Sequence, residues 1–186
     1  MIESKLDFTF EGTAIKFDET PFYTKFKSYH PSGKGVDFIS MDSTAYILVE
    51  VKNCLGYEQE NMWRTKTDFI NESGEESFDI EIAKKVEGTL ACLLGAKVAY
   101  PLAEADELKP YSEELCSGRY ENGRKSLEVI LFLEGDFGSK TRKKSMIMKR
   151  IQDKLGQKLK WLNCNVRVVD SETYRTNHFT VEHVTT

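Results

Sequence analysis

The sequence predicts an α/β domain built on a central mixed β-sheet that is flanked by helices. Two runs rich in β-branched and aromatic residues, at 45–52 and 127–133, have the composition of strands covered on both faces. Segments with helical spacing of apolar residues lie between and after them, at 77–94 and 139–162. Strands that alternate with helices are typical of layered α/β domains. A length of 186 residues suits one such domain, so we expect residues 1–186 to fold as a single unit.

Composition excludes several classes of protein. Hydrophobic residues make up 40% of the chain and aromatic residues 11%, which is too much for a disordered chain. Apolar runs, such as those at 45–49 and 90–94, are far shorter than the roughly 20 residues that a membrane span needs. The N-terminus shows no signal-peptide pattern, and the four cysteines are widely spaced, which suits reduced thiols. We therefore expect a cytoplasmic protein without a membrane partner.

The N-terminal part of the chain is predicted to form a β-hairpin and then a short helix. Residues 6–10 alternate between apolar and polar side chains, Gly12 favours a turn, and residues 14–17 form the returning strand. Pro21 suits the first turn of a helix that ends near residues 30–33.

Two adjacent strands are predicted next, at residues 35–40 and 45–52, joined by the short turn at 41–44. The second strand is apolar nearly throughout, so we expect it at the centre of the sheet. The polar stretch at 53–78 follows, with a helix expected around 58–70.

The rest of the chain is predicted to add two helices and two strands. Ser77 or Asp79 would cap the first of these helices, which Gly95 would end. Residues 97–125 have an irregular pattern. After the second apolar strand and the last helix, a final strand is expected at 165–169, followed by a polar tail.

Three charged residues interrupt strands that are otherwise apolar. Asp37 lies at mid-strand, and Glu50 and Lys52 share one face of their strand because strand side chains alternate. Burying unpaired charge is costly, so a compensating group is expected beside them. A hard cation such as Mg²⁺ or Mn²⁺ prefers oxygen ligands, and the Asp37 and Glu50 carboxylates with the Val51 carbonyl would supply three. Lys52 would then orient a water or stabilise developing negative charge. An ordinary cross-strand ion pair is the competing interpretation.

The pattern of Asp37, twelve further residues and then Glu50-Val51-Lys52 resembles the signature of the PD-(D/E)XK phosphodiesterase superfamily. The apolar residues around both parts of the motif are similar to that family's, and the resemblance extends over residues 18–169. It implies a restriction-endonuclease-like fold with an α-β-β-β-α-β core. It also implies Mg²⁺-dependent hydrolysis of nucleic-acid phosphodiesters, usually in DNA, with Asp37, Glu50 and Lys52 as catalytic residues.

Two further details follow from the resemblance. Many members carry an acidic residue in the helix before the first of these strands, and Glu19, beside Asp18, is assigned that role here. Val36 stands where the family signature has proline, a departure that many members share. The family also contains members that have lost activity.

Basic residues offer candidate contacts to nucleic acid. Lys84 and Lys85 lie on the helix after the motif, from which a polar side chain reaches the site in some related enzymes; a solvated helix face is the alternative. The segment 140–160 holds nine basic residues and one acid, a local net charge of +8. Lys143, Lys144 and Arg150 are its candidate phosphate contacts, although the charged face of a soluble helix would show the same pattern.

Three functions stay open at this point. The first is a metal-dependent endo- or exonuclease acting on nucleic acid, with DNA as the expected substrate. The second is a catalytically inactive member of the same fold that binds nucleic acid or a protein. The third is an unrelated α/β interaction protein. No recognition module is visible beyond the core, so a homo-oligomer or a partner subunit would supply specificity.

Overall fold

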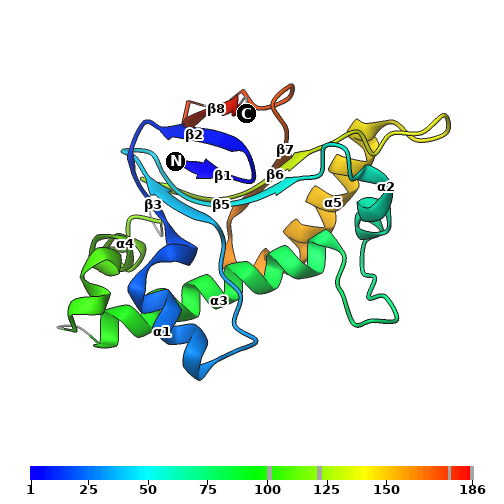
Figure 1. Cartoon of the computed structure of the whole chain (residues 1–186). Coiled ribbons are helices and arrows are strands. Elements are labelled where there is room, and N and C mark those ends of the chain that lie inside the picture. The colour runs from blue at the N-terminus through cyan, green and yellow to red at the C-terminus, as the bar shows by residue number, and fades with distance from the viewer. Residues whose placement is uncertain (100–101, 121–122, 176, 185–186) are drawn as a thin grey trace.

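The computed structural model describes residues 1–99, 102–120, 123–175 and 177–184. A five-stranded sheet lies between a helical layer and a second, three-stranded sheet (Figure 1). The predicted mixed sheet with flanking helices is confirmed at this level. The strands of the central sheet, in their spatial order, are β3 (Thr13–Lys16), β4 (Phe38–Met41), β5 (Ala45–Asn53), β6 (Ser126–Glu134) and β7 (Asn165–Val169). Neighbouring strands are antiparallel from β3 to β5 and parallel from β5 to β7.

The small sheet shows that the predicted N-terminal hairpin is wrong. Its strands are β1 (Ile2–Glu3), β2 (Leu6–Phe10) and β8 (Phe179–His183). β2 pairs with β1 and β8, whereas β3 pairs with β4 in the other sheet. The chain changes sheets beside Gly12, where an added Cβ would lie 2.2 Å from the Met41 carbonyl oxygen. β2 and β3 therefore do not pair with each other, and the polar tail contributes a strand, β8, that was not expected.

The described residues also form α-helices and short 3₁₀-helices. Their bounds are α1 (Pro21–Tyr29), α2 (Glu58–Asn61), α3 (Phe78–Ala99), α4 (Lys109–Leu115) and α5 (Lys144–Lys158). The short 3₁₀-helices are η1 (Phe17–Glu19), η2 (Met62–Thr65), η3 (Ala103–Leu108) and η4 (Lys160–Leu162). None of the helices in the described residues has the length and apolar character needed to cross a membrane.

Several predicted helix boundaries needed correction. α3 continues past Gly95 to Ala99, because a helix interior tolerates glycine at a cost of only about 1 kcal/mol. The stretch predicted to be irregular contains η3 and α4, since Pro110 falls in the first turn of α4 where no N–H partner is needed. The helix expected at 58–70 is limited to α2 and η2, and α5 begins only at Lys144.

The order of elements also differs in one respect from the expected α-β-β-β-α-β core. Around the central sheet the chain runs β3, α1, β4, β5, α3, β6, α5 and β7. α1 therefore follows the first strand of the sheet instead of preceding three consecutive strands.

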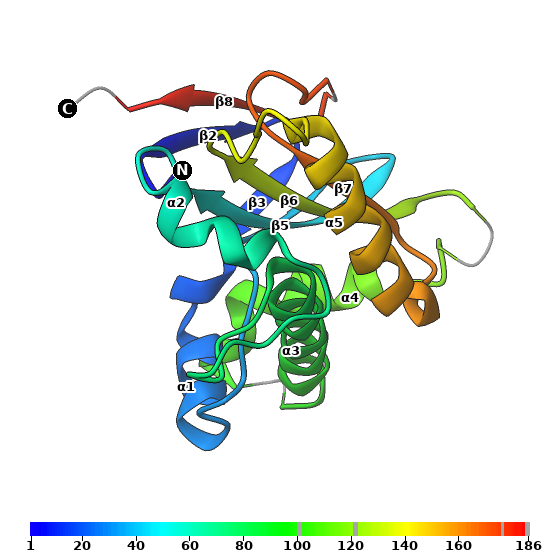
Figure 2. The same cartoon turned by 90° about the vertical axis from the view of Figure 1, so that its right-hand side faces the viewer.

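Two hydrophobic clusters cover the two faces of the central sheet. The larger cluster packs Tyr46 and Leu48 of β5 against the helices, including Ile82 of α3 and Ile151 of α5. The smaller cluster packs the alternate residues of β5, such as Val49, against the three-stranded sheet. Figure 2 shows α3 end-on beneath the sheet and β2 and β8 above it. β5 is thus a central strand covered on both faces, as its apolar run predicted.

α3 also fixes the loop that leads into β4. The backbone of Lys34 passes so close to Gly88 that a Cβ there would lie 2.0 Å from the Lys34 carbonyl oxygen. Next along α3, the Thr89 hydroxyl accepts a hydrogen bond from the Val36 N–H at 3.0 Å. These two contacts hold the chain immediately before Asp37.

Gly88→Ala is therefore expected to destabilise the protein by about 1–3 kcal/mol, the usual cost of overpacking, despite the higher helix propensity of alanine. The matched control is Gly156→Ala in α5, where an added Cβ meets nothing within 4 Å. That variant should gain about 1 kcal/mol from helix propensity. Urea denaturation of both variants measures the difference, and a stabilised Gly88→Ala variant would contradict the close approach.

Candidate active site

The two strands of the sequence motif are adjacent, as predicted. β4 and β5 pair antiparallel. Asp37 directly precedes β4, so its predicted position at mid-strand is wrong, but it still donates its N–H to the Val49 carbonyl at 3.1 Å. The Asp37 Oδ2 atom accepts a hydrogen bond from the Val51 N–H at 2.7 Å. This side-chain bond to the next strand fixes the Asp37 carboxylate beside Glu50.

Glu50 is the most enclosed acid of the site, with 1% of its side chain exposed. Its Oε1 atom receives the Lys85 ammonium at 2.5 Å and the Lys52 ammonium at 2.9 Å. Its Oε2 atom is buried and has no hydrogen-bond partner among the residues that the structure describes. The Lys85 Nζ atom also lies 3.8 Å from Asp37 Oδ1, so one ammonium group contacts both carboxylates.

Lys52 is held on its other side by a residue that the motif does not predict. Its ammonium lies 3.2 Å from an oxygen of Glu81, in the first turn of α3. The second oxygen of Glu81 accepts a hydrogen bond from Arg64, whose guanidinium lies over the ring of Phe78, 4.4 Å from its centre. Glu81 thus links the motif lysine to the segment before α3.

A second group of acids adjoins Asp37. Glu3 of β1, Asp18 of η1 and Asp37 each present a carboxylate oxygen within 4.8 Å of the others, close enough to share one cation. The Asp18 Oδ1 atom is buried without a hydrogen-bond partner in the described chain. Glu3 could not be expected here from sequence, because it reaches the site through the second sheet.

Glu19 does not take the place assigned to it. Its side chain is 67% exposed and lies 2.7 Å from the Lys16 ammonium. The tight turn of η1 directs the two neighbouring acids to different sides, so Asp18 faces the site and Glu19 faces solvent.

Burial raises the pKa of two acids in the site. Burial raises the pKa of Asp37 to about 7, and the negative charge of Glu50 adds to the effect, against the opposing influence of Lys85 and the Val51 N–H. Burial is also the main cause of a raised pKa at Asp18. Acids that burial and mutual repulsion make reluctant to ionise gain most from a divalent ion.

Asp37 should make the protein less stable as the pH rises from about 4 to about 7. Its pKa is 3.8 ordinarily and about 7 in the folded protein, so the folded state binds more protons in this window. The unfolding free energy therefore falls by up to about 1.4 kcal/mol per pH unit and levels off above pH 7. Urea denaturation across this range should show the slope in the wild type and not in Asp37→Asn. Equal slopes would contradict the assignment.

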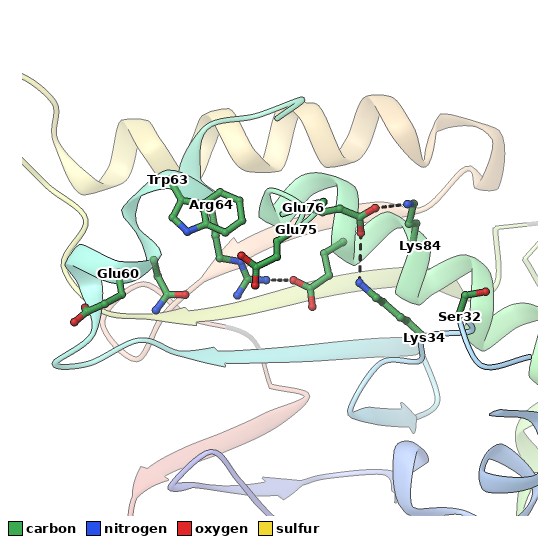
Figure 3. Close-up of a pocket in the computed structure, with 11 residues that line it drawn as sticks. Ser32, Lys34, Glu60, Trp63, Arg64, Glu75, Glu76 and Lys84 are labelled. Atoms are coloured by element: carbon green, nitrogen blue, oxygen red, sulfur yellow. Dashed lines mark hydrogen bonds and ion pairs between the residues drawn. The ribbon is translucent and has the colours of Figure 1, made fainter. Parts of the chain in front are cut away.

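Two hollows open beside these residues. One, of about 570 Å³, is lined by Asp18 and Lys85 among others. The other, of about 610 Å³, is lined by Trp63 and Arg64 from the segment before α3 (Figure 3). Both hollows include Lys34 and Glu81 in their walls. The acidic centre is therefore accessible from an extended polar surface.

The predicted basic contacts separate into different environments. Lys85 reaches the centre, whereas its neighbour Lys84 is exposed and pairs with Glu76. Several cations of α5 serve internal contacts: Lys144 with Asp170, Arg150 with the Thr65 carbonyl, Lys149 with Asp153, and Lys154 and Lys158 with Asp68. Lys143 remains exposed at the start of α5 and makes no ion pair within the described ranges.

No curated protein and no solved structure matches this chain. One family model does match, over residues 20–183, which includes Asp37, Glu50, Lys52 and Lys85. The chain therefore belongs to the Family of unknown function (DUF6661).

Proposed function

We propose that this protein is a metal-dependent phosphodiesterase that hydrolyses nucleic acid, with DNA as its substrate. The observation that carries the proposal is the convergence of Asp37, Glu50 and Lys52 at one end of two adjacent strands, with Asp18 beside them. Two carboxylates and a lysine in contact are the groups that hydrolysis of a phosphodiester needs for holding a cation and stabilising charge.

We also propose a restriction-endonuclease-like core for the central sheet. Antiparallel β4 and β5, the crossover α3 and the parallel strand β6 follow one another as the motif resemblance implies. The position of α1 between β3 and β4 is the departure from that order.

The donor set fits Mg²⁺ or Mn²⁺, which prefer carboxylate oxygens. Glu3, Asp18 and Asp37, whose carboxylate oxygens lie within 4.8 Å of one another, would hold the ion, and Glu50 stays a predicted ligand beside Asp37. Both Glu50 Oε2 and Asp18 Oδ1 are buried oxygens without a hydrogen-bond partner among the described residues. The Val51 carbonyl is a further ligand of the ion that the sequence predicts. When bound, such an ion supplies an activated water and neutralises charge on the phosphate.

Lys52 is the residue that we expect to stabilise developing negative charge in the reaction. Its ammonium is positioned by Glu50 and Glu81, and 20% of its side chain stays exposed. A compact cation held in this way can donate to the attacking water or to a phosphate oxygen as negative charge develops. Glu81 acts on the reaction through Lys52, as a positioning residue.

The direct test is degradation of linear, circular and single-stranded DNA with and without Mg²⁺ or Mn²⁺. Glu50→Gln, which keeps the shape of the side chain, is the inactive control. Cleavage of circular DNA would identify an endonuclease, and cleavage of linear DNA alone an exonuclease. Absence of metal-dependent cleavage of all three substrates would overturn the proposal.

One observation favours a second candidate function. Lys85 and Lys52 already compensate the charge of Glu50 without any metal ion. A centre neutralised by its own lysines suits a catalytically inactive member of the fold that binds nucleic acid or a protein. DNA binding without cleavage under all metal conditions would select this candidate.

Asp18→Asn should lower the rate of metal-dependent cleavage by at least about tenfold, since each carboxylate at the centre adds to the hold on the cation. Glu19→Gln is the matched control, because it removes the same charge one residue away on the solvent side. Cleavage rates under saturating and limiting Mg²⁺ compare the two variants. Equal rates would exclude Asp18 from the site.

A further inference from the structure

Two lysines from distant segments contact a single carboxylate on the wall of the hollow that is lined by Trp63 and Arg64. Lys34 lies in the loop before β4, and Lys84 lies on α3. Both ammonium groups contact Glu76: Lys34 Nζ lies 3.4 Å from Glu76 Oε2, and Lys84 pairs with Oε1 (Figure 3). A carboxylate that receives two ammonium groups shows where those groups can hold an anion.

The exposure of the three side chains is unequal. Glu76 is 9% exposed, whereas Lys34 and Lys84 are 45% and 55% exposed. The lysines can therefore turn to a ligand in solution without leaving the surface, because long side chains of this kind reorient easily. Glu76 precedes α3 in a short turn closed by hydrogen bonds of Asn71, so only its side chain has to move.

The lysine pair adjoins the candidate active site. Lys34 lines both the hollow that contains Trp63 and the hollow that contains Asp18 and Lys85. Glu81, which contacts Lys52, lines the same two hollows. An extended polymer bound at the centre would pass the lysine pair.

The net charge of the hollow does not favour anions while Glu76 holds both lysines. The hollow is lined by four acids, Glu60, Glu75, Glu76 and Glu81, and by three cations, Lys34, Arg64 and Lys84, so its net charge is 3 − 4 = −1. Displacing the carboxylate of Glu76 releases two cations at once. Glu76 is therefore the residue whose replacement should most change the affinity of this surface for anions.

We propose that Lys34 and Lys84 form a subsite for a backbone phosphate of nucleic acid, and that Glu76 occupies this subsite when no substrate is bound. This inference rests on the proposed function, since it names a substrate contact of the same site. Phosphate contacts of this kind position a strand without reading its sequence.

The test measures binding apart from cleavage. A short fluorescein-labelled DNA duplex and its single strand are titrated with protein in EDTA, and anisotropy gives the affinity over a range of salt. Glu76→Gln should bind about tenfold tighter, because it frees both lysines. Lys34→Gln combined with Lys84→Gln should bind about tenfold weaker, with a salt dependence flatter by about one unit of slope per lysine.

Lys97→Gln is the matched control, since it neutralises an exposed lysine of the same helix far from the hollow and should leave affinity unchanged. Glu76→Gln keeps the shape of the side chain, so it tests the subsite even if the double variant fails to fold. An affinity of Glu76→Gln equal to the wild type would overturn the subsite, as would a double variant that matches Lys97→Gln or an absence of wild-type binding. If the wild type cleaves DNA but the variants bind DNA with wild-type affinity, this inference alone is overturned. If the variants change affinity as expected but the wild type cleaves no DNA, the proposed function alone is overturned.

Discussion

Replacing Lys52 with alanine is expected to lower DNA cleavage by at least about a hundredfold and to leave DNA affinity within about twofold. The loss of one charge-stabilising donor at a reaction centre has an effect of this size. Lys52 is one cation among many that can contact phosphates, and two carboxylates already hold its ammonium in the ground state. Its contribution therefore falls on the transition state and not on binding.

Lys52→Arg is expected to fail as well. The ammonium lies 2.9 Å from Glu50 and 3.2 Å from Glu81, and a wide planar guanidinium cannot occupy the same position. Lys149→Ala serves as the control, because Lys149 is an exposed lysine paired within α5. Cleavage rate and affinity are measured on one linear duplex, with a melting curve for each variant. Wild-type cleavage by Lys52→Ala would refute the assigned role of this lysine.

The central part of the site could be predicted from sequence because it depends on local pairing. A short turn joins β4 and β5, and the apolar pattern of both strands fixes their register, since a shift of one residue would turn every side chain to the other face. Local pairing of this kind is enough to predict Asp37, Glu50 and Lys52 as neighbours.

The residues around that centre could not be predicted in the same way. Lys84 and Lys85 are adjacent in sequence, and only the rotation of α3 against the sheet decides that Lys85 enters the site. The same rotation brings Glu81 to Lys52. A pattern of apolar residues gives the buried face of a helix too coarsely to separate neighbouring positions.

Long-range pairing explains why the two N-terminal strands were predicted correctly but their pairing as a hairpin was wrong. β2 alternates like a hairpin strand, but its partner β8 lies at the opposite end of the chain. Alternation shows that a residue belongs to a half-buried strand and does not show which strand it pairs with. Because Glu3 lies in the sheet formed by this pairing, its approach to Asp37 could not be expected from sequence.

Lys85→Met is expected to make the stability of the protein depend on divalent metal ions. The substitution keeps the approximate length of the side chain and removes a cation from Glu50, which is 1% exposed. Lys52 then remains as the cation beside Glu50, but Asp37 loses its ion pair among the described residues. Removing one partner from a buried cluster of charges is costly, and we expect a loss of about 3 kcal/mol without metal. For a chain of this size that loss lowers the melting temperature by roughly 6–12 °C.

Mg²⁺ or Mn²⁺ should recover most of that loss in Lys85→Met and shift the wild type much less. In the wild type the Lys85 ammonium contacts both Asp37 and Glu50, so an ion that binds these carboxylates has to displace it. Without this competitor the variant binds the ion more tightly, and a ligand stabilises the folded state in proportion to the logarithm of its concentration over its dissociation constant.

Lys84→Met is the matched control for this experiment. It removes the same charge from the adjacent residue, whose ion pair with Glu76 lies at the surface and contributes at most about 1 kcal/mol. Melting temperatures of the wild type and both variants are measured against Mg²⁺ concentration. A Lys85→Met protein as stable as the wild type would contradict the buried contact with Glu50. A destabilised Lys85→Met protein that Mg²⁺ and Mn²⁺ do not rescue would show that the two carboxylates hold a lysine and not a metal, which is the arrangement expected of an inactive binding protein.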